Sequence, residues 1–418
     1  MSDSTVGSSP IRHVAATAIM FLLGLAACQP AAAAPAERTA IVGAKVYTSP
    51  DEQPIPDAVV LIENGRIKRV GPRSSTPVPP GYRTIDRTGQ VVTAGFWNSH
   101  VHLTTPPLLR ASTTSDEDLR RELQRDFTRW GFTTVFDLAS TSAIARDVRR
   151  RTHARVDGPR ILSVGEPFYP SGATPVYARP FYETYHLPSA EIASTRDAVR
   201  RVERQVAAGA DGIKVFTGSI VGGGRGVVHM PDEAIAAVVQ RAHRSGKPVF
   251  AHPTDRAGLE SAVTNGVDVL AHTAPLMGAW SPDYARWIAS HKVALIPTLS
   301  LVEVMPDSST PIGIAVQQTA AMHEAGGAIL FGTDAGFTEV FDTTMELRLM
   351  NSAIGWKGVL ASLTTSPAAI FGEAGKRGRV VPGYIADLVV LAGDPAERIE
   401  NAAEVQLVIK AGRIIFAR

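Results

Sequence analysis

The two ends of the chain share one pattern of apolar positions, short β-branched runs broken by turn residues. Near the N-terminus the runs cover residues 40–47, 58–63, 66–70 and 90–93, and Asn64-Gly65 is typical of a two-residue hairpin turn. Near the C-terminus they cover 386–391, 405–410 and 411–416. Because both ends predict strands, we expect one small discontinuous β-sandwich domain made of residues 39–93 and 376–418.

Between these ends, residues 94–375 alternate between apolar runs of strand length and segments with helical spacing. Apolar residues recur every three or four positions in the helices predicted at 195–208 and 232–244. Eight strand candidates cover 96–103, 132–138, 160–164, 212–217, 248–252, 267–272, 293–298 and 328–334. Eight βα repeats predict an α/β fold, specifically a (β/α)8 TIM-like barrel, in which the chemistry lies at the carboxyl ends of the strands.

A doubly wound parallel sheet is the competing architecture. It would place a glycine-rich phosphate turn after its first strand. The glycine-rich segment 222–226 instead follows the fourth strand candidate and lacks the G-x-G-x-x-G spacing. We therefore favour the barrel and interpret residues 222–226 as a flexible active-site loop.

An apolar run near the N-terminus predicts export. Residues 14–27 follow Arg12 and His13 and are too few to span a bilayer comfortably, which is typical of a signal peptide. Residues 25–28, Leu-Ala-Ala-Cys, resemble the lipobox of bacterial lipoproteins, whereas the alanines at 31–34 offer an ordinary cleavage site. We expect a signal peptide over 1–27 and a tether over 28–38, in an exported protein that is periplasmic or anchored to the membrane by a lipid on Cys28.

The composition removes several classes of protein. Of the 418 residues, 44% are hydrophobic and 20% are charged, which is too apolar for a disordered chain. A single cysteine cannot form a disulfide framework or a cysteine-based zinc site. With 42 basic and 40 acidic residues, the net charge of +2 offers no basic field for nucleic acid.

Side chains that can bind a metal ion lie at the ends of several predicted strands. His100 and His102 lie two positions apart, so both side chains point to the same face of the first strand. The fifth, sixth and eighth strands end at His252, His272 and Asp334. Any one of these histidines could simply be a buried residue of the core. Four strands that each end at a residue able to bind metal favour a metal site.

Lys214 lies in the strand predicted over 212–217, between Ile213 and Val215. An unpaired ammonium group would be unfavourable in such a buried strand. One interpretation is a salt bridge to a neighbouring acid. The other is a carbamate, formed when carbon dioxide adds to the amine, whose two oxygens could bridge two cations.

Together these motifs resemble the amidohydrolase superfamily, in particular its imidazolonepropionase-like and prolidase-like members. The resemblance runs from residues 40–44 through His100-Val101-His102 and 331–335 to 382–390. Residues 96–100, Phe-Trp-Asn-Ser-His, are also similar to secreted amidohydrolases that include ochratoxin-hydrolysing enzymes.

The resemblance implies a ligand set and a reaction. It assigns the more buried of two divalent ions, usually zinc, to His100, His102 and Asp334, the second ion to His252 and His272, and a bridging carbamate to Lys214. Hydroxide formed from a shared water would attack an amide or peptide carbonyl, and Asp334 would be the catalytic residue that carries the proton to the leaving amine. Imidazolonepropionase itself has one metal and no bridging lysine, so Lys214 points away from that activity.

Loops after the third and fourth strands are expected to form the substrate pocket. Their candidate contacts are Tyr169, Tyr177, Arg225 and His229, which could receive an aromatic side chain and a free carboxylate. We therefore predict a carboxypeptidase-like hydrolase of N-acyl or N-aroyl aromatic amino acids or dipeptides, with ochratoxin-type amides among its substrates.

Two other functions stay open. The chain could hydrolyse a cyclic amide, an imide or a lactone, or deaminate its substrate, as other members of the superfamily do. It could also be a non-catalytic lipoprotein that binds metal or solute. In every case we expect a small-molecule ligand, no nucleic acid, and a homo-oligomer.

Overall fold

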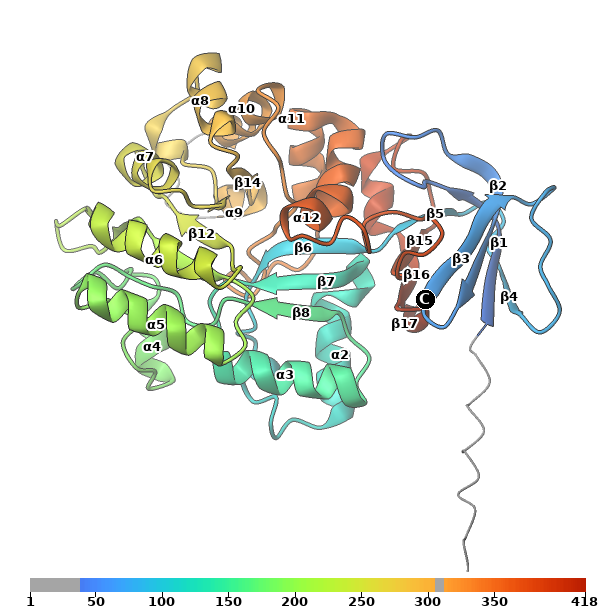
Figure 1. The fold of residues 1–418 in the computed structure, drawn as a ribbon, viewed down its shortest axis with the longest axis horizontal. Helices are drawn as coiled ribbons and strands as arrows, with labels where there is room; N and C mark the ends of the chain where they lie inside the picture. Colours follow the sequence, from blue (N-terminus) through green and yellow to red (C-terminus); the bar gives the residue numbers. More distant parts are fainter. Residues whose placement is uncertain (1–37, 305–311) are drawn as a thin grey trace, which may run out of the picture. The chain divides into compact units, whose positions relative to one another are not determined.

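Strands from both ends of the chain form one sheet in the computed structural model, which describes residues 38–304 and 312–418 (Figure 1). Within these ranges the sheet has eight strands in the order β17-β16-β15-β5-β1-β2-β3, with β4 paired to β1. Their bounds are β1 Arg38–Val46, β2 Ile55–Glu63, β3 Arg66–Pro72, β4 Arg83–Asp86, β5 Val91–Ala94, β15 Leu388–Leu391, β16 Val405–Lys410 and β17 Arg413–Ala417.

The strands predicted at both ends are confirmed, and the Asn64-Gly65 turn joins β2 to β3. Strand β4 has no counterpart among the predicted strands, because its residues are mostly exposed and contain no apolar run. The strands of both ends belong to a single sheet, so the two-layered sandwich and its boundaries stay predictions.

The predicted signal peptide, Cys28 and nearly all of the tether lie outside the described residues. Among the helices that are described, none is long and apolar enough to cross a membrane. Export and lipidation therefore stay predictions.

Parallel strands alternate with helices through the middle of the chain, as the pattern predicts. One parallel sheet contains β6 Phe96–Val101, β7 Phe132–Asp137 and β8 Arg160–Ser163. The other contains β9 Ile213–Phe216, β12 Val249–His252, β13 Val269–Ala271 and β14 Ala294–Ile296. Segment 222–226 lies at the tip of a short antiparallel hairpin, β10 Gly218–Ile220 with β11 Val227–His229.

Helices follow most of these strands, and those predicted at 195–208 and 232–244 are confirmed as α5 and α6. The α-helices are α1 Pro106–Leu109, α2 Asp116–Asp126, α3 Ser142–Ala154, α4 Arg179–Thr184, α5 Thr195–Ala207, α6 Asp232–Arg244, α7 Arg256–Thr264, α8 Pro282–Ser290, α9 Leu299–Val304, α10 Ile312–Glu324, α11 Thr344–Leu363 and α12 Thr365–Ile370. Short 3-10 helices are η1 Thr128–Trp130, η2 Pro275–Met277 and η3 Ile399–Ala403.

The eighth predicted strand, 328–334, forms isolated bridges instead of a regular strand. Its first part pairs with β14, because the Leu330 amide donates to the Leu295 carbonyl at 2.9 Å. Its second part pairs with β6, because the Ser99 amide donates to the Phe331 carbonyl at 2.7 Å. The segment changes partner within two residues, which leaves too few consecutive pairs for a regular ladder. It thereby connects the two parallel sheets.

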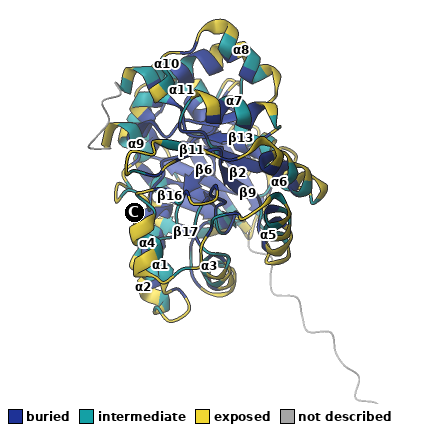
Figure 2. Cartoon of the chain, turned by 90° about the vertical axis from the view of Figure 1, so that its left-hand side faces the viewer, coloured by how far each residue is buried: buried dark blue, intermediate teal, exposed yellow. Residues whose placement is uncertain are grey.

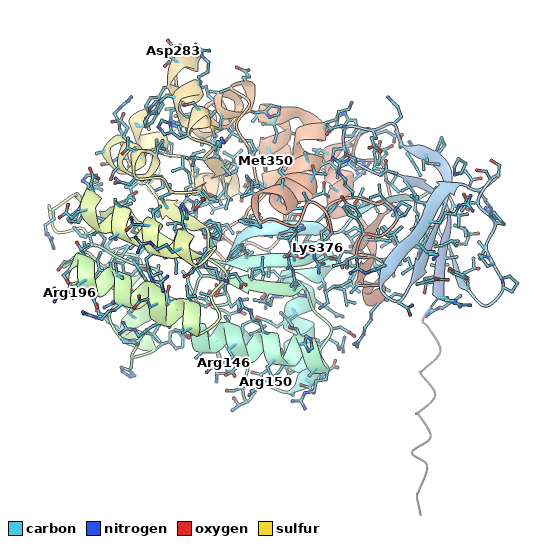
Figure 3. The ribbon with its side chains drawn as sticks, viewed as in Figure 1. Arg146, Arg150, Arg196, Asp283, Met350 and Lys376 are labelled. Atoms are coloured by element: carbon cyan, nitrogen blue, oxygen red, sulfur yellow. The ribbon has the colours of Figure 1, made fainter. Side chains whose placement is uncertain are left out.

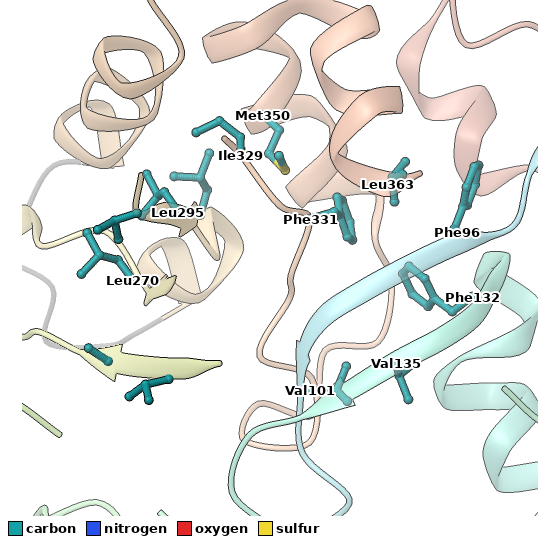
Figure 4. Close-up of a cluster of buried hydrophobic side chains, with 14 of the residues drawn as sticks. Phe96, Val101, Phe132, Val135, Leu270, Leu295, Ile329, Phe331, Met350 and Leu363 are labelled. Atoms are coloured by element: carbon teal, nitrogen blue, oxygen red, sulfur yellow. The ribbon is translucent and has the colours of Figure 1, made fainter. Parts of the chain in front are cut away.

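A continuous apolar core lies between the parallel strands and the helices around them. Figure 4 shows part of it, with Phe96 of β6, Phe132 of β7 and Phe331 of the connecting segment. The ring centroids of Phe132 and Phe331 are 5.9 Å apart. The central strands are buried and the outer helix surfaces exposed (Figure 2), as a parallel sheet covered by helices requires.

The arginine-rich helix α3 is only partly a solvated face. Arg146 and Arg150 are exposed, and both lie at the surface in Figure 3. Arg151, by contrast, is 5% exposed and donates to the carbonyls of Ala111 and Thr114, and it forms an ion pair with Asp116. Arg149 likewise donates to the carbonyls of Ile161 and Gly209, so at least two arginines of this run are structural.

Lys410 connects the end-strand sheet to the loop before β8, where it donates to the Gly158 carbonyl. Burial lowers the pKa of Lys410 to about 8. Between about pH 8 and the unfolded value near 10.5, the unfolded chain binds a proton that the folded chain does not, so stability rises with pH in this window. We expect Lys410→Met to remove a rise on the order of 2 kcal/mol, measured by chemical denaturation at pH 7.5 and 10.

Lys68→Met is the matched control for this prediction, because Lys68 is exposed on β3 of the same sheet. Native protein and the Lys68 variant should show the same pH dependence. An equal rise in the Lys410 variant would contradict the prediction.

Candidate metal centre

Six side chains that the sequence selects as metal ligands line one cavity at the carboxyl ends of the parallel strands. The cavity has a volume of about 460 Å³. His100 comes from β6, Lys214 from β9 and His252 from the end of β12. His102 and His272 follow β6 and β13 directly, and Asp334 comes from the connecting segment 328–335.

Asp334 lies between two of the histidines. Its Oδ1 atom is 2.9 Å from His100 Nε2 and 2.6 Å from His102 Nε2. The donor atoms of His100, His272 and Asp334 all lie within 4.8 Å of one another. The structure therefore brings a carboxylate and imidazoles from three segments to one point.

The four imidazole rings form a continuous series. The ring centroids of His102 and His100 are 5.2 Å apart, those of His100 and His272 are 4.7 Å apart, and those of His272 and His252 are also 4.7 Å apart. The His252 ring stacks on Phe216 at a centroid distance of 4.4 Å. All four candidate histidines thus converge, as the sequence analysis predicts.

Backbone pairing sets the position of Asp334. Its amide donates to the His100 carbonyl at 2.9 Å, and the His102 amide donates to the Ala335 carbonyl at 2.8 Å. Asp334 has a φ of 58°, a left-handed conformation that aspartate tolerates better than most residues. A Cβ atom on Gly336 would lie 2.1 Å from the His102 carbonyl oxygen, so only glycine allows this close approach.

Burial sets the charge states of these groups. It lowers the pKa of His100 to about 4 and the pKa of His252 and His272 well below the usual value. Burial acts to raise the pKa of Asp334, but His100 and His102 outweigh it and hold this pKa well below its usual range. Neutral imidazole and ionised carboxylate are the forms that bind metal ions.

Lys214 is 2% exposed, and burial lowers its pKa to about 7. Its Nζ atom lies 5.6 Å from the centroid of the Phe216 ring. Among the described residues, no carboxylate forms a salt bridge with it. A structural salt bridge is therefore not the arrangement here, and near neutral pH much of the side chain is the neutral amine, the form that can act as a nucleophile.

The donor set fits a divalent transition metal. Four imidazoles and one carboxylate are ligands that suit zinc, and manganese or cobalt would also fit such a set. His100 Nδ1 is buried and has no hydrogen-bond partner in the described part of the chain. A buried imidazole nitrogen without a partner, beside a buried carboxylate, is consistent with a site that an ion would complete.

Thr298 is a site residue that the sequence analysis missed. Its Oγ1 atom is 2.7 Å from His272 Nδ1 and donates its own hydrogen to the Pro297 carbonyl at 2.8 Å. The hydroxyl must therefore accept from Nδ1–H, which leaves the lone pair of His272 on Nε2 for a metal ion. Thr298 has a φ of 46°, which is strained for a β-branched residue.

Glu346 on α11 holds this strained turn. It is fully buried and accepts hydrogen bonds from the amides of Leu299 at 3.0 Å and Ser300 at 2.6 Å. Glu346 could have been singled out from the sequence, because it is an isolated acidic residue in a mostly apolar helical segment. Threonine after a strand is too common to single out Thr298.

The candidate substrate contacts separate into two groups. Tyr169 and Tyr177 line the cavity. Arg225 and His229 do not, because Arg225 Nη1 donates to the Gly172 carbonyl at 2.9 Å and His229 pairs with Asp255 at 2.9 Å. The structure therefore brings the predicted aromatic contacts to the centre but not the predicted cations.

Comparison with known proteins identifies similar sequences and folds. Residues 91–415 match the family model described as the amidohydrolase family. Ochratoxinase of Aspergillus niger is 23% identical over 418 residues, which cover 87% of this chain and 83% of that protein. The crystal structure of that ochratoxinase has a TM-score of 0.75 at 20% identity and covers 91% of this chain and 96% of the other.

A Xaa-Pro dipeptidase crystallised with bound methionine in its active site is also similar. Its TM-score is 0.76 at 22% identity, over 90% of this chain and 99% of that chain. At these identities the structural likenesses show a shared fold.

The Thr298 hydroxyl should affect metal binding directly. We expect Thr298→Val to weaken Zn²⁺ binding by about 10- to 100-fold, because the imidazole of His272 loses the group that orients it. Competition with a chromophoric chelator measures the affinity. Thr298→Ser keeps the hydroxyl and should retain the native affinity, whereas native affinity in the valine variant would contradict this role.

Proposed function

The chain belongs to the amidohydrolase family, and from this premise we propose that it is a binuclear metal-dependent hydrolase that cleaves an amide or peptide bond. One observation carries the proposal: four histidines, a buried lysine and an aspartate from five segments of the chain line one cavity. A buried, ionised carboxylate without a cation would be unfavourable, and the neutral imidazoles of His100, His252 and His272 are ready to bind one.

We propose that each ligand acts as the resemblance implies. His100, His102 and Asp334 would hold one ion, and His252 and His272 would hold the second. The Lys214 amine would add carbon dioxide and release one proton, and the resulting carbamate would supply oxygen ligands to the ions. Two divalent cations held there, zinc being well suited, would acidify a water and polarise the substrate carbonyl.

The chain's own residues then move the proton. Asp334 accepts it at its carboxylate and transfers it to the nitrogen of the scissile amide, so that the leaving group departs as a neutral amine. The products are a carboxylic acid and an amine, which balances the addition of one water. The His102 and His100 contacts of Asp334 keep this carboxylate aimed at the reacting atoms.

We also propose that the parallel strands close as a (β/α)8 barrel. The connecting segment 328–335 supports this, since it bonds to β14 on one side and β6 on the other. A second link supports it between β8 and β9, where the Phe168 amide donates to the Lys214 carbonyl at 2.9 Å. All six ligands would then lie at the catalytic end of the barrel.

The substrate is proposed to carry an aromatic group. The hypothesis of a carboxypeptidase-like preference for N-acyl or N-aroyl aromatic amino acids requires both an aromatic group and a free carboxylate on the substrate. The aromatic cavity wall supports the aromatic group. Ochratoxinase among the relatives supports an amide of that general kind. The free carboxylate has less support, because the predicted cationic contacts Arg225 and His229 do not line the cavity.

Export is a separate proposal that rests on sequence alone. The apolar run 14–27 and Cys28 support secretion and a lipid anchor.

Metal content and turnover test the proposed function together. We expect purified, zinc-loaded protein to hold about two ions per chain by elemental analysis and to hydrolyse an N-aroyl aromatic amide. Chelation should abolish turnover, and added zinc should restore it. Asp334→Asn should lower kcat by at least about 100-fold, because it removes the proton carrier.

Asp283→Asn is the control for that variant, because the Asp283 side chain is 90% exposed on α8 and should leave metal content and kcat unchanged. Protein with less than one ion per chain, or an active Asp334 variant, would remove the basis of the proposal. Binding of both ions without any hydrolysis would instead favour a solute-binding role.

Lys214→Ala should separate a two-metal from a one-metal centre. Loss of the bridging carbamate should reduce the content to about one ion per chain, whereas exposed-surface Lys68→Ala should keep two. Two ions retained in the Lys214 variant would contradict the bridge and favour a different arrangement of ligands.

A further inference from the structure

We infer that the cavity selects neutral aromatic amides, in which the amine part carries no carboxylate. This inference rests on the proposed function and names the substrate class of the same site. It differs from the carboxypeptidase-like hypothesis, which needs a cation beside the scissile bond.

Six aromatic residues line the cavity outside the metal centre. They are Tyr169, Tyr177, Phe181, Tyr182, Phe216 and Phe337. Tyr177 and Phe337 meet edge to face with centroids 5.4 Å apart, and Tyr169 and Phe216 do so at 4.7 Å. Such a wall offers ring faces and edges to an aromatic ligand.

The polar groups of this wall are already hydrogen-bonded. Thr104 donates to the Gly336 carbonyl at 2.6 Å, and the hydroxyls of Tyr169 and Tyr182 bond to each other. Tyr177 Oη lies 3.4 Å from His252 Nε2. If that nitrogen binds a metal ion, the Tyr177 hydroxyl becomes one neutral donor near the reacting carbonyl.

Cations near the cavity are engaged elsewhere. Arg179 donates to the Val221 carbonyl at 3.0 Å and Arg225 to the Gly172 carbonyl at 2.9 Å. His229 pairs with Asp255. Among the described residues that line the cavity, Lys214 is the one lysine or arginine, and it is assigned to the centre itself. Residues 305–311, Met-Pro-Asp-Ser-Ser-Thr-Pro, contain no basic residue that could be added.

A carboxylate on the amine part of the substrate would therefore lose water without gaining a counter-charge from any side chain of the wall, while the proposed ions would be engaged by their own ligands and the scissile carbonyl. Burial of an unpaired carboxylate is strongly unfavourable, and a single phenol compensates for little of it. The exposed part of the lining adds to this preference, because Ile220 and Phe337 line the cavity and remain 36% and 41% exposed. Both side chains are apolar, so neither supplies a counter-charge to an acid.

A pair of substrates that differ only in the carboxylate tests the inference. N-Benzoyl-phenylalanine and N-benzoyl-phenethylamine share the scissile amide, the acyl group and the aromatic ring. With zinc-loaded full-length protein, we expect kcat/KM to be at least about 10-fold higher for the neutral amide. A higher kcat/KM for the acid would overturn the inference.

Two arginine variants test whether a surface cation swings into the cavity. We expect Arg225→Ala and Arg179→Ala to leave the ratio of the two kcat/KM values unchanged. Selective loss of acid turnover in either variant would overturn the inference, because it would identify that arginine as a carboxylate anchor.

A gain-of-function variant tests the missing charge itself. Ile220→Arg places a guanidinium on the rim, and Ile220→Gln is the neutral control of similar length. We expect the arginine variant alone to raise the relative kcat/KM of the acid by about 10-fold or more. No shift, or the same shift in both variants, would overturn the role of charge.

Direct binding separates this inference from the proposed function. Calorimetry with each amide and zinc-loaded Asp334→Asn protein should show at least about 10-fold tighter binding of the neutral amide. If neither amide is hydrolysed by native protein but this preference holds, the proposed function fails and the inference stands. Equal or tighter binding of the acid would overturn the inference whatever the turnover.

Discussion

The backbone hydrogen bonds of residues 328–335 are the interaction on which the rest of the molecule depends. On one side they join this segment to β14, and on the other to β6. The two parallel sheets are connected through this segment, and the same bonds fix Asp334 beside His100 and His102. The packing of the core and the geometry of the site therefore share one cause. A change that loosens this segment would affect both at once.

Burial divides the polar groups of the centre into two kinds. The imidazoles of His100, His252 and His272 become neutral and the carboxylate of Asp334 stays ionised, so the site is prepared to bind cations before any ion arrives. Lys214 is the exception, since a buried amine without a carboxylate partner is poorly suited to a purely structural role. Thr298 and Asp334 have φ values of 46° and 58°, a conformation that is strained for the β-branched threonine and better tolerated by aspartate.

Much of the fold and of the site could be predicted from the sequence. Apolar runs located β6, β9 and β12, and strand-end histidines identified a common site because parallel strands bring their carboxyl ends together. The polar strand β4 and the broken eighth strand were not predictable from periodicity, because pairing with distant segments determines them. Thr298 and Glu346 were missed for a related reason, since their role depends on a turn that only the folded chain forms. Arg225 and His229 lie in the predicted loop region, but the β10–β11 hairpin directs them to partners outside the cavity.

The sheet built from both chain ends has a consequence for the order of folding. Leu391 of β15 pairs with Val91 of β5, and about 300 residues separate them. During synthesis the edge of β5 that pairs with β15 stays unpaired until almost the whole chain has left the ribosome. Contacts within the middle of the chain can form earlier. Strands β15, β16 and β17 are synthesised last and complete the sheet. A chain that is truncated before them would expose an unpaired, apolar sheet edge. The apolar residues of β5 that stabilise the complete protein would then make the truncated chain prone to aggregation or degradation.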